Sequence, residues 1–308
     1  RSMVLTMGAM TQNLGNELLA EMARLKAAGC VGISNGLSPI KNSVILQRAM
    51  AYAATLDMTV FITASDPWLQ SQGCVHEGAV SSRLGLGGIA ESAETVALSR
   101  DLILIEQTGV RAHFHNLSTG KAVKLIREAQ NRGLPVTADV SAHHLHLSEH
   151  DLGNYDALSH VLPPFRSIRD REQLQQGVRD GVISAISSHH QPLDIDDKLG
   201  PFAETKPGIS GLETLLPLTM KLVEDDEVNL HTALAALTCN PADILGIDSG
   251  QIKVGAVADI CLIDPDSEYE CRPLNFVSAG KNSPFEGWLF NHQVSHTLFH
   301  GRLVHERD

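Results

Sequence analysis

Residues 111–140 read RAHFHNLSTGKAVKLIREAQNRGLPVTADV, and their order of elements indicates the fold class. At 111–117 apolar residues alternate with polar ones, which predicts a strand, and over 119–131 apolar side chains stand at helical spacing, which predicts a helix. A second β-branched run follows at 135–140. Two strands joined by one helix over so short a segment are typical of parallel strands with a crossover helix.

The same order of elements is repeated on both sides of this stretch. We expect further helices near 16–28, 43–56, 90–108, 168–178, 211–224 and 229–238, and further strands at 30–34, 58–63, 158–162 and 183–188. A helix follows almost every strand, and no Gly-x-Gly-x-x-Gly loop marks a dinucleotide-binding fold. The pattern therefore predicts the α/β class, as a TIM-type (β/α)8 barrel.

The alternation of strands and helices ends after Gly250. Residues 251–263 and 295–305 predict short antiparallel β segments, the second a hairpin around Gly301. We therefore expect a barrel over 1–250 and a small composite β domain to which 251–308 contribute. The first strand is expected near 3–7, and too few strands precede it for an eight-stranded closure, so N-terminal barrel strands are expected to be missing from this sequence.

Composition excludes several classes of protein. The formal net charge is −12, from 24 basic and 36 acidic residues, and the basic residues are scattered, so we expect no nucleic-acid partner. No apolar run is long enough for a membrane span and no signal peptide is visible, which predicts a cytoplasmic protein. The five cysteines form no Cys-x-x-Cys pair, which argues against a structural zinc site and a disulfide framework.

Several segments are weak signals alone but specific in their order and spacing. They are SSRLGLGGI (81–89), Ser118-Thr119, PVTADVSAHHL (135–145), VLPPFR (161–166), PGISGLET (207–214), Asn240-Pro241, KVGAVAD (253–259) and NSPFEGW (282–288). Together they resemble the class of dihydroorotases that is related to hydantoinases and other amidohydrolases. The resemblance covers nearly the whole chain.

The resemblance implies zinc at the C-terminal mouth of the barrel, where it activates water and polarises a cyclic amide while a carboxylate moves the proton. This chain differs at the matching positions. Asn35 stands in place of an acid, Thr63 and Asn116 in place of imidazole ligands, His189 in place of the catalytic Asp, and Leu162 and Leu193 in place of substrate contacts. A His-x-His pair of the first strand would lie outside this sequence.

These substitutions predict a chain without catalytic residues, without a cofactor and with its zinc site lost. They resemble a group of dihydroorotase-like chains that assemble with aspartate transcarbamoylase. We therefore expect a non-catalytic subunit of pyrimidine biosynthesis, in a hetero-oligomer with the aspartate transcarbamoylase catalytic chain. Two alternatives remain open. One is an active zinc-dependent dihydroorotase or related cyclic amidohydrolase that uses the His-x-His pair outside this sequence together with His189, and the other is a regulatory module that binds a small pyrimidine or amino acid.

The sequence contains 15 histidines, which could by themselves suggest a zinc hydrolase. If Asn116 faces the barrel interior, strand alternation predicts that His113 and His115 point outward as packed core residues. Weak metal candidates remain at His143, His144, His189 and His190. The segment 118–121 opens a helix and predicts either an N-cap or a seat for an anion.

Overall fold

The computed structural model describes residues 3–307 and is built around a six-stranded parallel sheet. Its order, β1-β2-β3-β6-β7-β8, follows the chain, so each strand is added to the same edge. The strands are β1 (Met7–Ala9), β2 (Gly32–Ser34), β3 (Val60–Thr63), β6 (Ala112–His115), β7 (Val136–Ser141) and β8 (Ala185–Ser187). Every pairing in this sheet is parallel, as the sequence predicts.

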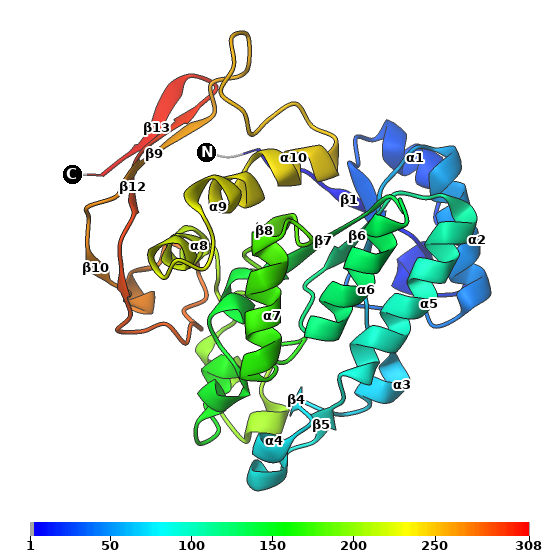
Figure 1. Ribbon diagram of the computed structural model, residues 1–308, viewed down its shortest axis with the longest axis horizontal. Helices are drawn as coiled ribbons and strands as arrows, with labels where there is room; N and C mark the ends of the chain where they lie inside the picture. The colour runs from blue at the N-terminus through cyan, green and yellow to red at the C-terminus, as the bar shows by residue number, and fades with distance from the viewer. Residues whose placement is uncertain (1–2, 308) are drawn as a thin grey trace.

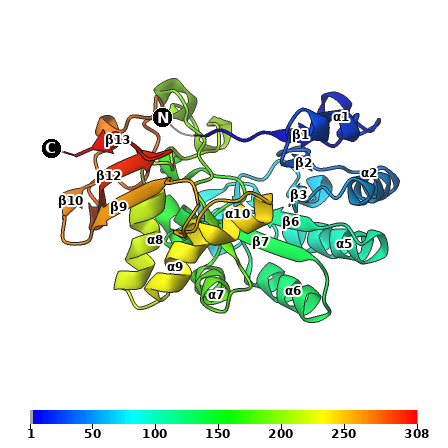
Figure 2. The same cartoon turned by 90° about the horizontal axis from the view of Figure 1, so that it is seen from above.

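Helices connect the strands and form an arc outside them, which Figure 2 shows from above. They are α1 (Met22–Ala27), α2 (Ser43–Thr55), α5 (Ser92–Thr108), α6 (Gly120–Asn131) and α7 (Ile168–Arg179), followed after β8 by α8 (Leu215–Glu224), α9 (Leu230–Leu237) and α10 (Cys239–Leu245). Figure 1 shows α5, α6 and α7 side by side along β6, β7 and β8. This arrangement is a curved sheet with its helices on the convex side.

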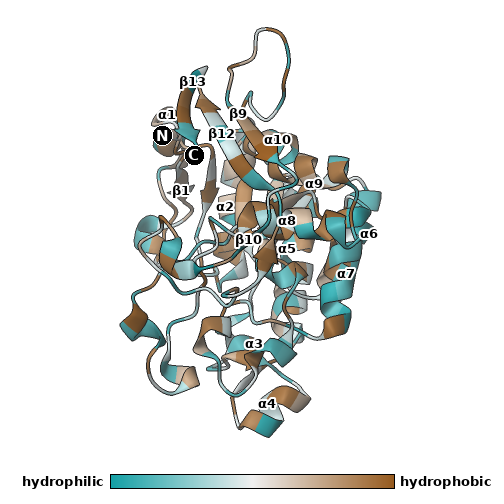
Figure 3. Cartoon of the chain, turned by 90° about the vertical axis from the view of Figure 1, so that its left-hand side faces the viewer, coloured by the Kyte–Doolittle hydropathy of each residue, from teal (hydrophilic) through white to brown (hydrophobic). Residues whose placement is uncertain are grey.

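The main core lies between the sheet and this arc of helices. Phe114 and Val140 of the strands and Leu98, Ile126 and Val178 of the helices are fully buried in one apolar cluster. Figure 3 shows hydrophilic residues on the outward side of α6 and α7. Because side chains alternate along a strand, the strand residues between the core positions face the opposite side, which is the barrel interior.

The connection from β3 to α5 contains elements that the sequence analysis did not predict. They are α3 (Pro67–Gln70), β4 (Val75–His76), α4 (Ala79–Leu84) and β5 (Gly88–Ile89). A second apolar cluster of Cys74, Val75, Val80, Leu152 and Phe202 holds this excursion against the loops after β7 and β8. The excursion therefore adds a wall near the C-terminal ends of the strands.

The C-terminal residues form the expected small antiparallel β structure. It contains β9 (Ile260–Asp264), β12 (Gln293–Phe299) and β13 (Arg302–Glu306), with β10 (Tyr269–Glu270) paired to β11 (Leu289–Phe290). His300 and Gly301 join β12 to β13 with φ values of 51° and 73°. Two positive φ angles suit a two-residue hairpin turn, so the predicted hairpin is confirmed.

Three predicted boundaries are wrong. No strand forms near 158–162, because Asp156 caps a 3-10 turn at Ala157–Ser159 and Pro163 and Pro164 lack the N–H that a strand needs. The helix predicted from residue 16 begins at Met22, since Leu19 pairs with Thr11 in a β-bridge. The first strand lies at Met7–Ala9 and not at 3–7. None of the described helices is long and apolar enough to cross a membrane.

Candidate functional site

Strands β6 and β7 bring two histidines and an aspartate together inside the barrel. His113 and His115 lie on β6, and Asp139 lies on β7. The Oδ2 atom of Asp139 accepts hydrogen bonds from Nε2 of His113 at 3.0 Å and from Nδ1 of His115 at 2.7 Å. One possible ligand atom from each residue lies within 4.8 Å of the others, so this cluster could hold a metal ion. We call it the His-His-Asp cluster.

The prediction that His113 and His115 point outward under the helices is wrong. Phe114 lies between them and is fully buried in the core on the helix side, so its neighbours face the interior. The prediction counted back from Asn116 by strict strand alternation. Asn116 has a φ of 53°, a left-handed backbone that breaks the alternation, and it lines the same cavity as His115.

Hydrogen bonding sets the protonation of the cluster. Burial by itself raises the pKa of Asp139, but hydrogen bonds from His113 and His115 outweigh burial and hold that pKa well below its usual range. Burial lowers the pKa of His113 despite its bond to Asp139. The cluster therefore presents an ionised carboxylate and a neutral imidazole at neutral pH, which are the forms that bind metal ions.

The donor set fits a catalytic zinc ion. Two imidazoles and one carboxylate are ligand types that catalytic zinc sites use, and the three donor atoms already lie within 4.8 Å of one another. His113, His115 and Asp139 would therefore hold the ion. Thr137 Oγ1 lies 2.7 Å from Nδ1 of His113 and fixes the orientation of its ring.

The prediction of a chain with no cofactor and a lost zinc site is therefore wrong. That prediction rested on Thr63 and Asn116, whose hydroxyl and amide groups are weak zinc ligands. The structure offers other donors at positions 113, 115 and 139.

Polar groups from β8 and the residues after it surround the cluster. Ser187 Oγ donates to Asn116 Oδ1 at 3.2 Å and also lies 3.3 Å from Asp139 Oδ1. His189 has a φ of 40° and lines the same cavity as His115. Burial lowers the pKa of His189, and the charge of Asp139 opposes this. A neutral imidazole thus stands beside the cluster.

The other predicted histidine candidates lie around this mouth. The rings of His143 and His189 are stacked with centroids 5.9 Å apart, and Nε2 of His143 is buried with no hydrogen-bond partner in the described part of the chain. His144 is bound through both nitrogens, to Ser141 Oγ and Pro163 O, and His190 Nδ1 accepts from Gly211 N. Among residues 3–307, none of these histidines joins a group of three possible ligands.

Asn35 lies away from the cluster and is 5% exposed. Its Oδ1 accepts from the backbone N and the hydroxyl of Thr11, and its Nδ2 donates to Asn16 Oδ1 and Ser38 O. This amide has its bonds satisfied by neighbouring loops. Asn35 therefore holds the loop after β2 in place.

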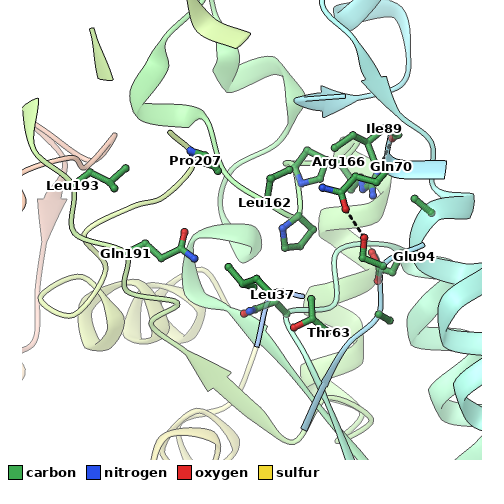
Figure 4. Close-up of a pocket in the computed structure, with 16 residues that line it drawn as sticks. Leu37, Thr63, Gln70, Ile89, Glu94, Leu162, Arg166, Gln191, Leu193 and Pro207 are labelled. Atoms are coloured by element: carbon green, nitrogen blue, oxygen red, sulfur yellow. Dashed lines mark hydrogen bonds between the residues drawn. The ribbon is translucent and has the colours of Figure 1, made fainter. Parts of the chain in front are cut away.

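Two cavities open at the C-terminal ends of the strands. The first, of about 780 Å³, is lined by His115, Asn116, Ser187 and His189, and we call it the metal-side cavity. The second, of about 300 Å³, is the side chamber, and the predicted positions Leu162 and Leu193 line it (Figure 4). Leu37, Thr63, Asn116 and Gln191 border both cavities. The two cavities therefore form one branched site.

A buried polar group that the sequence analysis missed supports the wall of the side chamber. Glu94 accepts hydrogen bonds from the backbone N and the hydroxyl of Ser118 and from Thr119 N. Arg166 Nε donates to Ser118 Oγ at 3.1 Å and Nη1 donates to Ile89 O at 2.6 Å. The N-cap prediction for 118–121 is confirmed, since Thr119 caps α6 through Ala122 N. The expected seat for an anion is filled by the chain itself, because the amides of Ser118 and Thr119 donate to Glu94 and that of Gly120 donates to Asp170.

Known proteins similar to this chain share a family and a fold. The Amidohydrolase family model matches residues 17–304. A dihydroorotase-like protein of Pseudomonas aeruginosa is 47% identical over 303 residues, which cover 98% of this chain and 71% of that protein. A dihydroorotase of Geobacter sp. is 39% identical, with the same two coverages. The L-hydantoinase (dihydropyrimidinase) from Arthrobacter aurescens is 23% identical with a TM-score of 0.87, over 98% of this chain and 70% of its own.

These findings bear directly on two predictions. The structural likeness confirms the barrel class with a small C-terminal β domain, while the division at residue 250 stays a prediction. The prediction that the chain is not an enzyme is contradicted, because relatives 38–39% identical are named dihydroorotase and the cluster offers a metal site. That prediction failed because it judged the site only at the family's ligand positions and had placed His113 and His115 outside it.

Proposed function

Since the chain belongs to the amidohydrolase family, we propose that it is a zinc-dependent hydrolase that opens or closes a ring amide, of the dihydroorotase or related cyclic-amidohydrolase type. The observation that carries this proposal is the His-His-Asp cluster beside a cavity large enough for a small ring. The relatives' names support the reaction class. The cluster supplies the chemistry that such a reaction needs.

His113, His115 and Asp139 would hold the ion, with Thr137 fixing the first ring. When bound, zinc supplies a Lewis acid that polarises the amide carbonyl and lowers the pKa of a bound water. The Asn116 side chain borders both cavities and can orient the ring of the substrate. Each role follows from where the side chain lies.

The proposal assigns the proton transfers to His189. Because burial keeps its imidazole neutral near pH 7, it can accept a proton from the attacking water and pass it to the amide nitrogen. The water oxygen bonds to the carbonyl carbon as the ring C–N bond breaks. The products are a carboxylic acid and a free ureido or amino group, so atoms and charge balance.

Zinc-loaded protein incubated with hydantoin, dihydrouracil and dihydroorotate tests the proposal, with the ring-opened product separated by chromatography. We expect turnover of at least one ring, its loss with a chelator, and a decrease of about 100-fold or more in His115→Gln. His150→Gln is the matched control, because His150 is exposed and stands outside both cavities. A fully loaded protein that opens none of the three rings would contradict the proposal.

A hetero-oligomer with the aspartate transcarbamoylase catalytic chain stays a prediction from the resemblance, as does a cytoplasmic location. Co-purification of the two chains at a fixed stoichiometry from the native source would support the assembly. Elution of this chain alone under the same conditions would count against it. The assembly and the hydrolase activity are independent outcomes.

A further inference from the structure

The side chamber differs in chemistry from the metal-side cavity that it joins. Three leucines and three prolines contribute apolar surface to its walls, namely Leu37, Leu162, Leu193, Pro163, Pro164 and Pro207. Figure 4 shows that the three leucines come from different segments around one space. A ring placed at the His-His-Asp cluster would reach this chamber past Thr63 and Asn116, which border both cavities.

We infer that the side chamber is a specificity subsite for an apolar substituent, so that the substrate is a cyclic amide or ureide that carries an alkyl or aryl group there and no carboxylate. This inference rests on the proposed function, which leaves the substituent open. It assigns Leu37, Leu162 and Leu193 as the residues that select the substrate.

The walls favour an apolar group because they expose apolar surface to water. Leu37 is 61% exposed although it borders both cavities, and Leu162 and Leu193 are half-buried. Covering such surface with another apolar group is favourable in proportion to the area removed from water. Each methylene that is fully buried strengthens binding about fourfold.

Two of the polar side chains that line the chamber are engaged in hydrogen bonds. Gln70 Oε1 accepts from Ser65 Oγ at 2.6 Å. Arg166 is 4% exposed and its Nε and Nη1 are bound to Ser118 and Ile89. The buried carboxyl group of Glu94 lines the same chamber. A ligand that approached Arg166 would therefore also meet this acid. A carboxylate that entered would lose its water and gain no free cation.

A matched pair of ligands tests this selectivity. The 5-isobutyl and 5-carboxymethyl hydantoins have side groups of nearly equal size and differ in charge. We would measure both dissociation constants by calorimetry on the zinc-loaded chain, with 5-methylhydantoin as the short reference. We expect the isobutyl compound to bind at least about tenfold more tightly than the methyl compound, and the carboxymethyl compound to bind more weakly than either.

Variants assign the effect to the chamber. Leu162→Asn and Leu193→His should each weaken binding of the isobutyl compound about fivefold or more and leave 5-methylhydantoin within about twofold, since only the longer group reaches the wall. Leu199→Asn is the control, because Leu199 is 66% exposed in the loop after β8 and does not line the chamber. Circular dichroism and the zinc content of each variant verify that fold and metal are retained.

The outcomes separate this inference from the proposed function. Equal or tighter binding of the carboxymethyl compound overturns the apolar subsite and leaves the hydrolase intact. Tight isobutyl binding that neither leucine variant weakens places the group elsewhere and also overturns the subsite. If no hydantoin binds and no ring is opened, the proposed function fails, and the inference fails with it.

Discussion

The Asp139→Asn substitution distinguishes the contribution of Asp139 to the stability of the metal-free fold from its contribution to zinc binding. Asp139 is 3% exposed and its Oδ2 atom accepts from both His113 and His115. Hydrogen bonds to charged groups contribute about 1.5–3 kcal/mol, against about 1 kcal/mol for neutral ones. The NH2 group of the new amide would also face an N–H group of a histidine ring, so one hydrogen bond would be lost. We expect Asp139→Asn to lower the free energy of unfolding of the metal-free protein by about 3 kcal/mol.

The larger effect concerns zinc. Changes outside the ligand shell already lower metal affinity 10–100-fold, so loss of the carboxylate ligand should weaken binding by at least about 100-fold. At a zinc concentration of about 100 times the wild-type dissociation constant, the wild type gains about 2.7 kcal/mol of stability and the variant about 0.4 kcal/mol or less.

Urea unfolding with and without zinc measures both the stability of the metal-free protein and the stability gained from zinc. Asp101→Asn is the matched control, because Asp101 is a buried acid on α5 that is paired with Arg100 and stands outside the cluster. It should keep the full zinc-dependent gain. A wild type that zinc does not stabilise, or an Asp139→Asn variant that keeps the full gain, would refute the assignment of the metal to these residues.

Three further predictions concern stability and the support of the cluster. Burial raises the pKa of Asp101 to about 6 against the opposing effect of Arg100. The stability from its protonated form is complete below about pH 4 and is lost as pH rises through 6, so Asp101→Asn should be more stable above pH 6 by up to about 3 kcal/mol in urea unfolding and show little gain at pH 4. In Gly32→Ala the new Cβ would collide with the ring of Phe61, whose centroid lies 5.3 Å from that of the His115 ring. The displaced ring should disturb His115, so zinc affinity measured by calorimetry should fall about tenfold. Unchanged affinity would show that Phe61 does not support the cluster. Phe114→Ala should cost about 3–5 kcal/mol in the same unfolding assay, while a loss below about 1 kcal/mol would contradict its place in the core.

Elements that have strong local signals were predictable from the sequence. Helices α5, α6 and α7 and strands β6 and β7 lie close to the expected residues, because their apolar spacing matches burial on one face. The elements α3, β4, α4 and β5 were not predicted. They are two to six residues long and are held by contacts with Leu152 and Phe202 from distant loops, which no local pattern reveals.

The site was predictable in its location but not in its chemistry. Thr63, Asn116, Leu162, His189 and Leu193, chosen from the resemblance, all line the two cavities. The His-His-Asp cluster was missed because the left-handed backbone of Asn116 breaks the strand alternation from which the directions of His113 and His115 were predicted. The buried Glu94 and Arg166 were missed because hydrogen bonds across loops that are far apart in sequence leave no local signal.

The left-handed backbone at Asn116 makes this position suitable for introducing a further metal ligand by substitution. Asparagine, aspartate and histidine are the side chains that tolerate such a backbone best, so an imidazole or a second carboxylate could be installed there by a single codon change without rebuilding the strand. The neighbouring His115 already points into the same space. The barrel is thus a scaffold on which the number of metal-binding groups can be varied one at a time.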